Sequence, residues 1–119
     1  MRLISCHIEN FGKFNNVDVD FSDGINVFLK ENGWGKSTLA AFLRIMLFGF
    51  EGDKVRNEIE NERKRYKPWT GGTPYGGNLT FMDADGDIFV ISRVFGQKQA
   101  DDTFELRNLE TNSISDKYS

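Results

Sequence analysis

The segment that joins a short apolar run to an apolar helix carries the residue types expected to bind phosphate. It ends in Gly35-Lys36-Ser37-Thr38. Backbone N–H groups in such a turn converge on phosphate oxygens, and the positive end of the new helix adds to the attraction. We expect Lys36 to reach the terminal phosphates and the Ser37 hydroxyl to bind a magnesium ion beside them. The predicted chemistry is the binding of a nucleoside triphosphate with Mg²⁺.

The segment departs from the usual phosphate-loop pattern, G-x-x-x-x-G-K-[ST], at its first glycine. That position holds Lys30, where a glycine would let the backbone bend without a Cβ penalty. Trp34 places a large ring inside the same turn. Two interpretations stay open: a phosphate loop that binds nucleotide, and a structural turn in which Lys36 is solvated.

The apolar pattern predicts the elements that position this turn. Residues 36–48 are apolar nearly all round, which predicts a helix at the centre of the core, and Gly49 is a natural C-terminal cap. Strands are expected over residues 3–8, 17–21, 25–29, 78–83, 88–95 and 104–109. Connecting loops or turns are expected over residues 10–16, 22–24, 68–77 and 96–102.

These elements predict an α/β fold, in which a mixed or largely antiparallel sheet packs on the apolar helix. The chain of 119 residues suffices for one domain of modest size. Within it, residues 1–49 hold the first strands, the phosphate turn and the helix, and residues 50–78 form a charged and then glycine-rich loop region. Residues 79–119 are expected to add a second layer of β-hairpins.

Composition narrows the classes of protein. A charged content of 28% and a hydrophobic content of 39% are typical of a soluble globular domain. The net charge of −3 argues against a standing basic surface for nucleic acid. The single cysteine, Cys6, excludes an internal disulfide and fits a reducing, cytoplasmic compartment. No apolar run approaches the ~20 residues of a membrane span, so no membrane contact is expected.

Three further groups of residues are of types that can bind phosphate or a metal ion. The segment 51–67 is highly charged and is expected to be solvated, but its basic cluster could meet a DNA backbone or a nucleotide phosphate. His7 has no second histidine with which to share a metal. The triad of Asp83, Asp85 and Asp87 resembles a calcium loop, but its glycine is misplaced and no glutamate closes it, so a hairpin turn is predicted. The basic cluster consists of Arg63, Lys64, Arg65 and Lys67.

The order of these segments resembles the start of an SMC-like ATPase, a coiled-coil ATPase of chromosome maintenance and DNA double-strand-break repair. The resemblance rests on Leu3–Phe14, the Gly24-Ile25-Asn26-Val27 strand, the phosphate turn, and a helix that ends in Phe48-Gly49. Tyr66-Lys67-Pro68-Trp69, followed by a Gly-Gly pair, is similar to the SbcC-like group of this family.

The resemblance implies a P-loop ATPase head that is split across the sequence and dimerises head to head with ATP between its copies. Carried over position by position, the nucleotide-binding residues are Asn32, Gly33, Trp34, Gly35, Lys36, Ser37 and Thr38. Lys13 matches the loop that approaches the nucleotide in the family, and Gln97 and Gln99 are candidates for a glutamine that helps to hold magnesium. No catalytic residue is assigned.

The chain also lacks features that the resemblance implies, namely a signature motif and an apolar strand that ends in Asp-Glu. We therefore expect these 119 residues alone to bind ATP weakly, to hydrolyse it slowly or not at all, and to cover exposed apolar surface by self-association. One alternative is a non-catalytic interaction domain with a degenerate phosphate loop. Another is a small P-loop kinase or transferase, although that class needs crossover helices where hairpins are predicted here.

Overall fold

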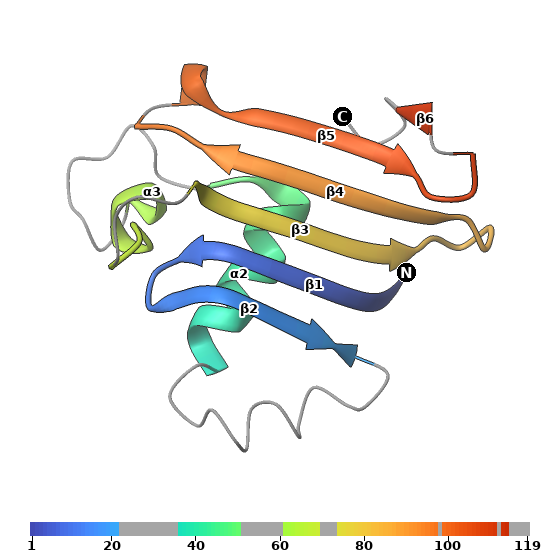
Figure 1. Cartoon of the computed structure of the whole chain (residues 1–119), viewed down its shortest axis with the longest axis horizontal. Helices are drawn as coiled ribbons and strands as arrows, with labels where there is room; N and C mark the ends of the chain where they lie inside the picture. The colour runs from blue at the N-terminus through green and yellow to red at the C-terminus, as the bar shows by residue number, and fades with distance from the viewer. Residues whose placement is uncertain (22–35, 51–60, 70–73, 98, 112, 115–119) are drawn as a thin grey trace.

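In the computed structural model, alternating apolar residues form strands and the apolar run that begins at Lys36 forms a helix (Figure 1). The structure describes residues 1–21, 36–50, 61–69, 74–97, 99–111 and 113–114. The strands are β1 (Arg2–Phe11), β2 (Phe14–Asp20), β3 (Tyr75–Met82), β4 (Ile88–Phe95), β5 (Thr103–Asn108) and β6 (Ser113–Ile114). The helices are α2 (Lys36–Phe48), the short α3 (Glu62–Arg65) and the 3-10 turn η2 (Gln99–Asp101). The strand expected over residues 25–29 and the turn over 22–24 lie outside the described residues.

The strands form one sheet in the order β2-β1-β3-β4-β5-β6, and every neighbouring pair is antiparallel. The expected α/β arrangement of a largely antiparallel sheet on one apolar helix is confirmed. The second layer of hairpins is not, because β1 lies between β2 and β3 and the later strands extend the first hairpin sideways. In the described part of the chain, residues after Gly49 form hairpins rather than parallel strands with crossover helices, which disfavours the small kinase or transferase.

A two-residue turn, Gly12-Lys13, joins β1 to β2, and Phe11 lies opposite Phe14 across it. Gly12 has φ of 55°, in the left-handed region that glycine adopts without strain, as at the first central position of a type II′ turn. The loop predicted over residues 10–16 is therefore wrong. Asn10 and Asn15 are paired strand residues, and asparagine is a poor strand signal.

One face of the sheet is apolar, and α2 packs on it. Neighbouring strands contribute a buried row that runs across the sheet: Cys6, Leu79, Ile91 and Leu106. α2 buries one side against this face through Leu39, Ala41, Phe42, Ile45 and Met46. Gly77 allows the close approach, because a Cβ there would lie 3.0 Å from the Phe42 Cζ atom and 2.2 Å from the His7 carbonyl oxygen.

The C-terminal end of α2 is capped as predicted. Gly49 has φ of 83°, and its N–H donates to the Ile45 carbonyl at 2.7 Å. Arg93 Nε on β4 donates to the Met46 carbonyl at 2.8 Å, which satisfies a carbonyl that the helix leaves unpaired. This arginine also fixes the end of the helix over the sheet.

The outer side of α2 is less buried than the sequence predicts. Phe48 is 77% exposed, Ala40 is exposed, and Leu43 and Leu47 are half-buried. The prediction of a helix surrounded by core is wrong for this side within the described residues. None of the described helices has the length and apolarity that crossing a membrane requires.

The opposite face of the sheet is polar and holds a three-residue cluster around His7. His7 Nδ1 lies 2.7 Å from Asp18 Oδ1 on β2, and His7 Nε2 lies 2.9 Å from Glu9 Oε2. The hydrogen bond to Glu9, and then the one to Asp18, raises the pKa of His7 above its ordinary value. The sequence interpretation of His7 as a strand-surface residue is confirmed.

This cluster makes stability depend on pH. Because the pKa of His7 is raised in the folded state, its contribution is present below its unfolded pKa of about 6.5 and is lost as pH rises through the folded value. The stability difference between wild type and His7→Gln should shrink in urea unfolding as pH rises above about 6.5. Glu9→Gln removes the main cause, so it should move the loss to lower pH. A pH-independent difference would contradict the assignment.

Candidate functional site

The predicted phosphate turn leads into the start of α2. Asn32, Gly33, Trp34 and Gly35 lie outside the described residues, so their arrangement remains a prediction. Lys36 is the first residue of α2, Ser37 is exposed and Thr38 is half-buried in the first turn of that helix. No acidic residue occupies this first turn, so the positive end of the helix is not neutralised there.

The β1–β2 turn packs against this end of α2. A Cβ built on Gly12 would lie 3.5 Å from the Thr38 Cγ2 atom, which places the Gly12 backbone beside the Thr38 side chain. Lys13 follows Gly12 directly and is half-buried. The structure therefore brings Lys13, Ser37 and Thr38 together from segments more than twenty residues apart in the chain. The sequence motif identified Ser37 and Thr38 and the family resemblance added Lys13, but neither predicted this contact.

A segment from beyond α3 holds the same turn from the other side. The Gly12 N–H donates to the Tyr66 carbonyl at 2.7 Å, and the Trp69 N–H donates to the Gly12 carbonyl at 2.9 Å. The Tyr66 ring stacks on Phe11 with centroids 4.9 Å apart and an angle of 14° between the rings.

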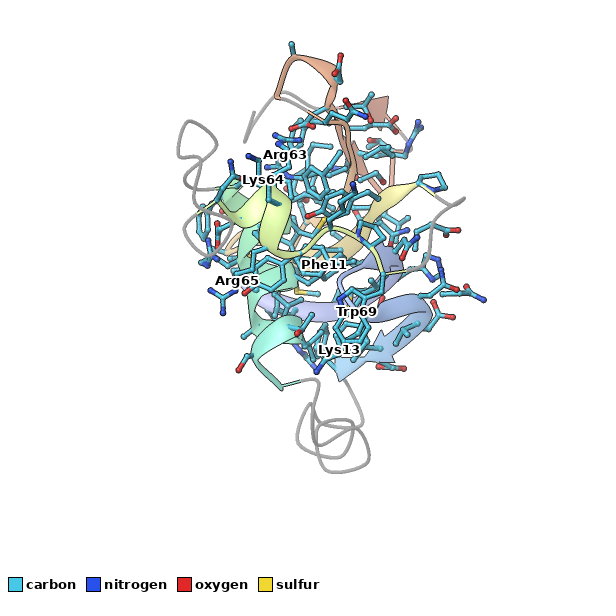
Figure 2. The ribbon with its side chains drawn as sticks, turned by 90° about the vertical axis from the view of Figure 1, so that its left-hand side faces the viewer. Phe11, Lys13, Arg63, Lys64, Arg65 and Trp69 are labelled. Carbon is cyan, nitrogen blue, oxygen red and sulfur yellow. The ribbon has the colours of Figure 1, made fainter. Side chains whose placement is uncertain are left out.

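Exposed cations and an exposed indole surround the turn (Figure 2). Lys64, Arg65 and Lys67 are exposed, and the Arg65 guanidinium lies 5.3 Å from the centre of the Tyr66 ring. Trp69 is 76% exposed and lies beside Lys13 at this edge of the sheet. The end of the sheet at the β1–β2 turn therefore concentrates positive charge in a chain whose net charge is −3.

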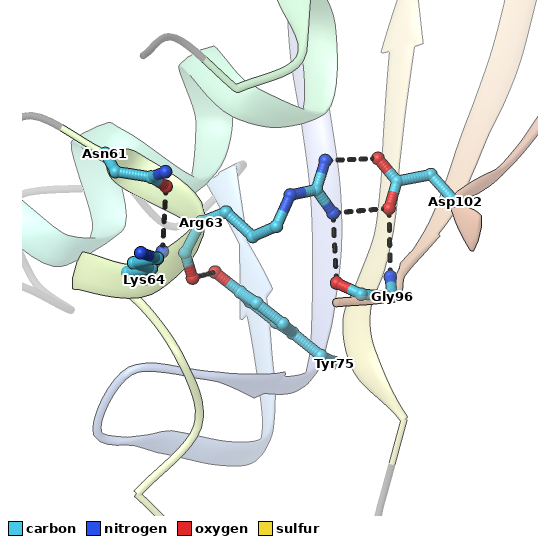
Figure 3. A network of polar contacts seen from close by, with 6 residues as sticks. All are labelled: Asn61, Arg63, Lys64, Tyr75, Gly96 and Asp102. Carbon is cyan, nitrogen blue, oxygen red and sulfur yellow. Dashed lines mark hydrogen bonds and ion pairs between the residues drawn. The ribbon is translucent and has the colours of Figure 1, made fainter. Parts of the chain in front are cut away.

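Arg63, the fourth member of the predicted basic cluster, is buried and structural (Figure 3). Its guanidinium binds both carboxylate oxygens of Asp102 at 2.5 and 2.7 Å, and donates to the Gly96 carbonyl at 3.0 Å. The Tyr75 hydroxyl donates to the Arg63 carbonyl at 3.1 Å. The expectation that this segment is solvated is wrong for Arg63, and the alternative that the basic cluster meets a phosphate does not extend to it, because Asp102 neutralises its charge.

A second charged pair attaches α3 to α2. Arg44 on α2 binds the Glu62 carboxylate through both of its terminal nitrogens, one of them at 3.1 Å. The Asn61 side chain accepts from the Lys64 N–H at 3.2 Å and caps α3. These contacts fix the start of the segment that reaches the turn. Residue types alone did not reveal them, since Asn61, Glu62 and Lys64 lie in the charged stretch that was expected to be solvated.

The remaining candidates do not gather at this end of α2. Gln97 lines a concavity of about 530 Å³ with Lys64, Lys67, Pro68 and other residues, none of them from α2. The side chain of Gln99 lies outside the described residues. Asp83 Oδ1 accepts from the Asp85 and Asp87 N–H groups at 3.0 Å each, which is the hairpin turn that the sequence predicted.

Comparison with known proteins gives a match for nearly the whole chain. Residues 5–119 match the family model described as an AAA domain. The chain is 37% identical over 97 residues to the uncharacterized protein YhaN of Bacillus subtilis, which covers 81% of this chain and 9% of that protein. It is 30% identical over 102 residues to a DNA double-strand break repair Rad50 ATPase of Methanococcus maripaludis, which covers 86% of this chain and 10% of that protein. No solved structure matches significantly.

These matches confirm the resemblance to SMC-like and SbcC-like P-loop ATPases that the motifs indicated. The chain spans about a tenth of the length of the curated relatives that it matches. The similarity includes the β1–β2 turn, α2 and the segment that holds the turn, since all lie within the matched residues.

The Arg63–Asp102 pair should stabilise the fold around α3, from which the segment that contacts the Gly12-Lys13 turn continues. Asp102→Asn leaves a buried guanidinium without its counter-charge, so we expect a loss of about 3 kcal/mol in the free energy of unfolding, measured in urea. Glu105→Gln, which breaks the exposed pair with Arg107, is the matched control and should cost less than about 1 kcal/mol. Equal losses in the two variants would contradict a structural role for Arg63.

Proposed function

Because this chain belongs to the AAA domain family, we propose that it binds ATP with Mg²⁺ at the start of α2, as part of an SMC-like or SbcC-like ATPase. One observation carries the proposal: the Gly12-Lys13 turn packs on the first turn of α2, so a lysine lies next to the positive end of a helix. The exposed Ser37 hydroxyl lies at the same end. These groups suit a triphosphate, which needs N–H donors and cations along its length.

In this proposal, each residue of the site has its own chemical role. The backbone N–H groups of residues 32–38 hold the β- and γ-phosphates, and Lys36 balances their charge. Ser37 holds the magnesium ion, which supplies charge neutralisation when bound. Lys13 approaches from the neighbouring turn and adds a cation that the phosphate turn itself does not contain.

We further propose that hydrolysis depends on parts of a longer protein. Among the described residues, the first turn of α2 holds no acidic side chain that could position a water molecule for attack on the γ-phosphate. The chain matches only about a tenth of each relative, and a general base in another lobe, together with a second head, would complete the site. A role in DNA repair or chromosome maintenance, with DNA as a partner of the full assembly, belongs to this same proposal.

A non-catalytic interaction domain is the second candidate, and Lys30 is the observation that favours it. This lysine occupies the position of the first glycine of the phosphate loop, where a side chain constrains the turn. The two candidates differ in one measurable property, the affinity of the chain for nucleotide.

Nucleotide titration by calorimetry tests the proposal directly. Lys36→Ala should weaken ATP binding at least tenfold, since a hydrogen bond to a charged group contributes about 1.5–3 kcal/mol. Arg107→Ala on β5, four strands from β2 in the sheet order, is the control and should bind as the wild type does. Lys30→Gly should tighten binding if the lysine constrains the loop. Equal affinity in Lys36→Ala and wild type, or no binding in either, favours the interaction domain.

Exposed apolar surface near the end of α2 predicts self-association of the chain. A hollow of about 440 Å³ lies there and is lined by Met1, Leu47, Phe48, Phe81, Asp83, Ala84, Ile91 and Phe104. We expect light scattering to show a species larger than a monomer at high concentration, and Phe48→Ser to reduce it. Leu109→Ser, at another exposed apolar site, should not. A clean monomer of the wild type would contradict this expectation.

A further inference from the structure

We propose that the Trp69 indole is the platform on which the base of the nucleotide stacks. The inference rests on the proposed function, because it extends the phosphate site at the start of α2 to the other end of the same ligand. Nothing in the motif assigns a role to Trp69, which lies more than thirty residues beyond the phosphate turn.

Trp69 is unusual because a large apolar ring is left in water on a backbone that is fixed. Its side chain is 76% exposed, and no described aromatic ring stacks on it. Its N–H nevertheless donates to the Gly12 carbonyl at 2.9 Å. Pro68, directly before it, restricts the backbone further. A fixed backbone limits where the exposed indole can lie, which favours an incoming ligand because less conformational entropy is lost on binding.

The hydrogen bond that holds the Trp69 backbone is connected to the hydrophobic core through Gly12. The Gly12 N–H donates a second hydrogen bond to this segment, at the Tyr66 carbonyl (2.7 Å), and Tyr66 stacks on Phe11. Phe11 is fully buried and meets the Phe42 ring of α2 edge-on at 5.2 Å. The Trp69 backbone is thus connected to the phosphate-binding helix through two hydrogen bonds and two ring contacts.

The location of the indole fits a ligand with an anionic end and an aromatic end. Gly12 packs against Thr38 in the first turn of α2 on one side and bonds to Trp69 on the other. Lys13, the next residue, lies beside the indole (Figure 2). Phosphates at α2 and a ring on Trp69 would therefore lie on either side of one glycine. A nucleotide has this arrangement of charge and ring within a single molecule.

The chemistry of the platform also predicts its selectivity. Stacking on an aromatic ring tolerates every base, because each base has a π-face. ATP and GTP should therefore bind with similar affinity, and both should bind more tightly than inorganic tripolyphosphate. The difference between nucleotide and tripolyphosphate measures the contribution of the base.

Calorimetric titration of three variants with ATP, GTP and tripolyphosphate, each with Mg²⁺, tests the proposal. Trp69→Ala should weaken ATP and GTP about tenfold or more and leave tripolyphosphate unchanged. Trp69→Phe keeps an aromatic face and should retain most of the affinity. Leu109→Ala removes another exposed apolar side chain and should change nothing. Thermal unfolding of Trp69→Ala should match the wild type, because its side chain is mostly in solvent.

The outcomes separate this inference from the proposed function. If Trp69→Ala binds ATP as tightly as the wild type while Lys36→Ala does not, the platform is overturned and the phosphate site stands. If Trp69→Ala loses affinity for tripolyphosphate as well, the indole supports the turn and contacts no base, which also overturns the inference. If the wild type binds neither ATP nor tripolyphosphate, the proposed function and the platform fall together.

Discussion

The contacts of Gly12 are the constraint on which the rest of this end of the molecule depends. Both of its backbone groups are bonded to the segment 66–69, and its backbone lies against the Thr38 side chain of α2. Its φ of 55° lets β1 turn into β2 within two residues. One glycine thereby sets the distance between the sheet, the helix and the segment beyond α3.

Charge pairing explains how a segment of very polar composition becomes part of the scaffold. Arg44 binds Glu62, and Arg63 binds Asp102, so each pair joins α3 to a different element. The buried guanidinium of Arg63 also lies 4.8 Å from the centre of the Phe50 ring. The cations that remain exposed, Lys64, Arg65 and Lys67, then face solvent at the edge where the turn lies. Pairing thus decides which basic residues can meet an anionic ligand.

Local sequence patterns predicted the helix and most strands. The order of the strands and the burial of charged residues depend on contacts between distant segments, which local patterns do not show. α2 was predicted with its observed bounds because thirteen residues of strong apolar character end at a glycine. The position of β3 beside β1 was not predictable, since it joins segments about seventy residues apart through backbone bonds that no residue type signals. The burial of Arg63 was missed for a similar reason, because its partner Asp102 lies 39 residues away.

For the candidate site, the residue types identified Lys36, Ser37 and Thr38, and the resemblance added Lys13. The geometry of residues 32–35 lies outside the described part of the chain, so the phosphate turn itself is still known by its motif. Trp69 appeared in the sequence as one of two aromatics in a loop, and only its hydrogen bond to Gly12 distinguishes it from an ordinary surface residue.

Main-chain atoms make the two bonds that hold the turn, and this has an evolutionary consequence. The side chains of Lys67 and Trp69 can change without loss of either bond, because neither bond uses a side-chain atom. Related sequences can therefore exchange these side chains, one charged and one aromatic, while keeping the same scaffold. The ligand that this part of the surface recognises can therefore change during evolution without loss of the contacts that preserve the fold.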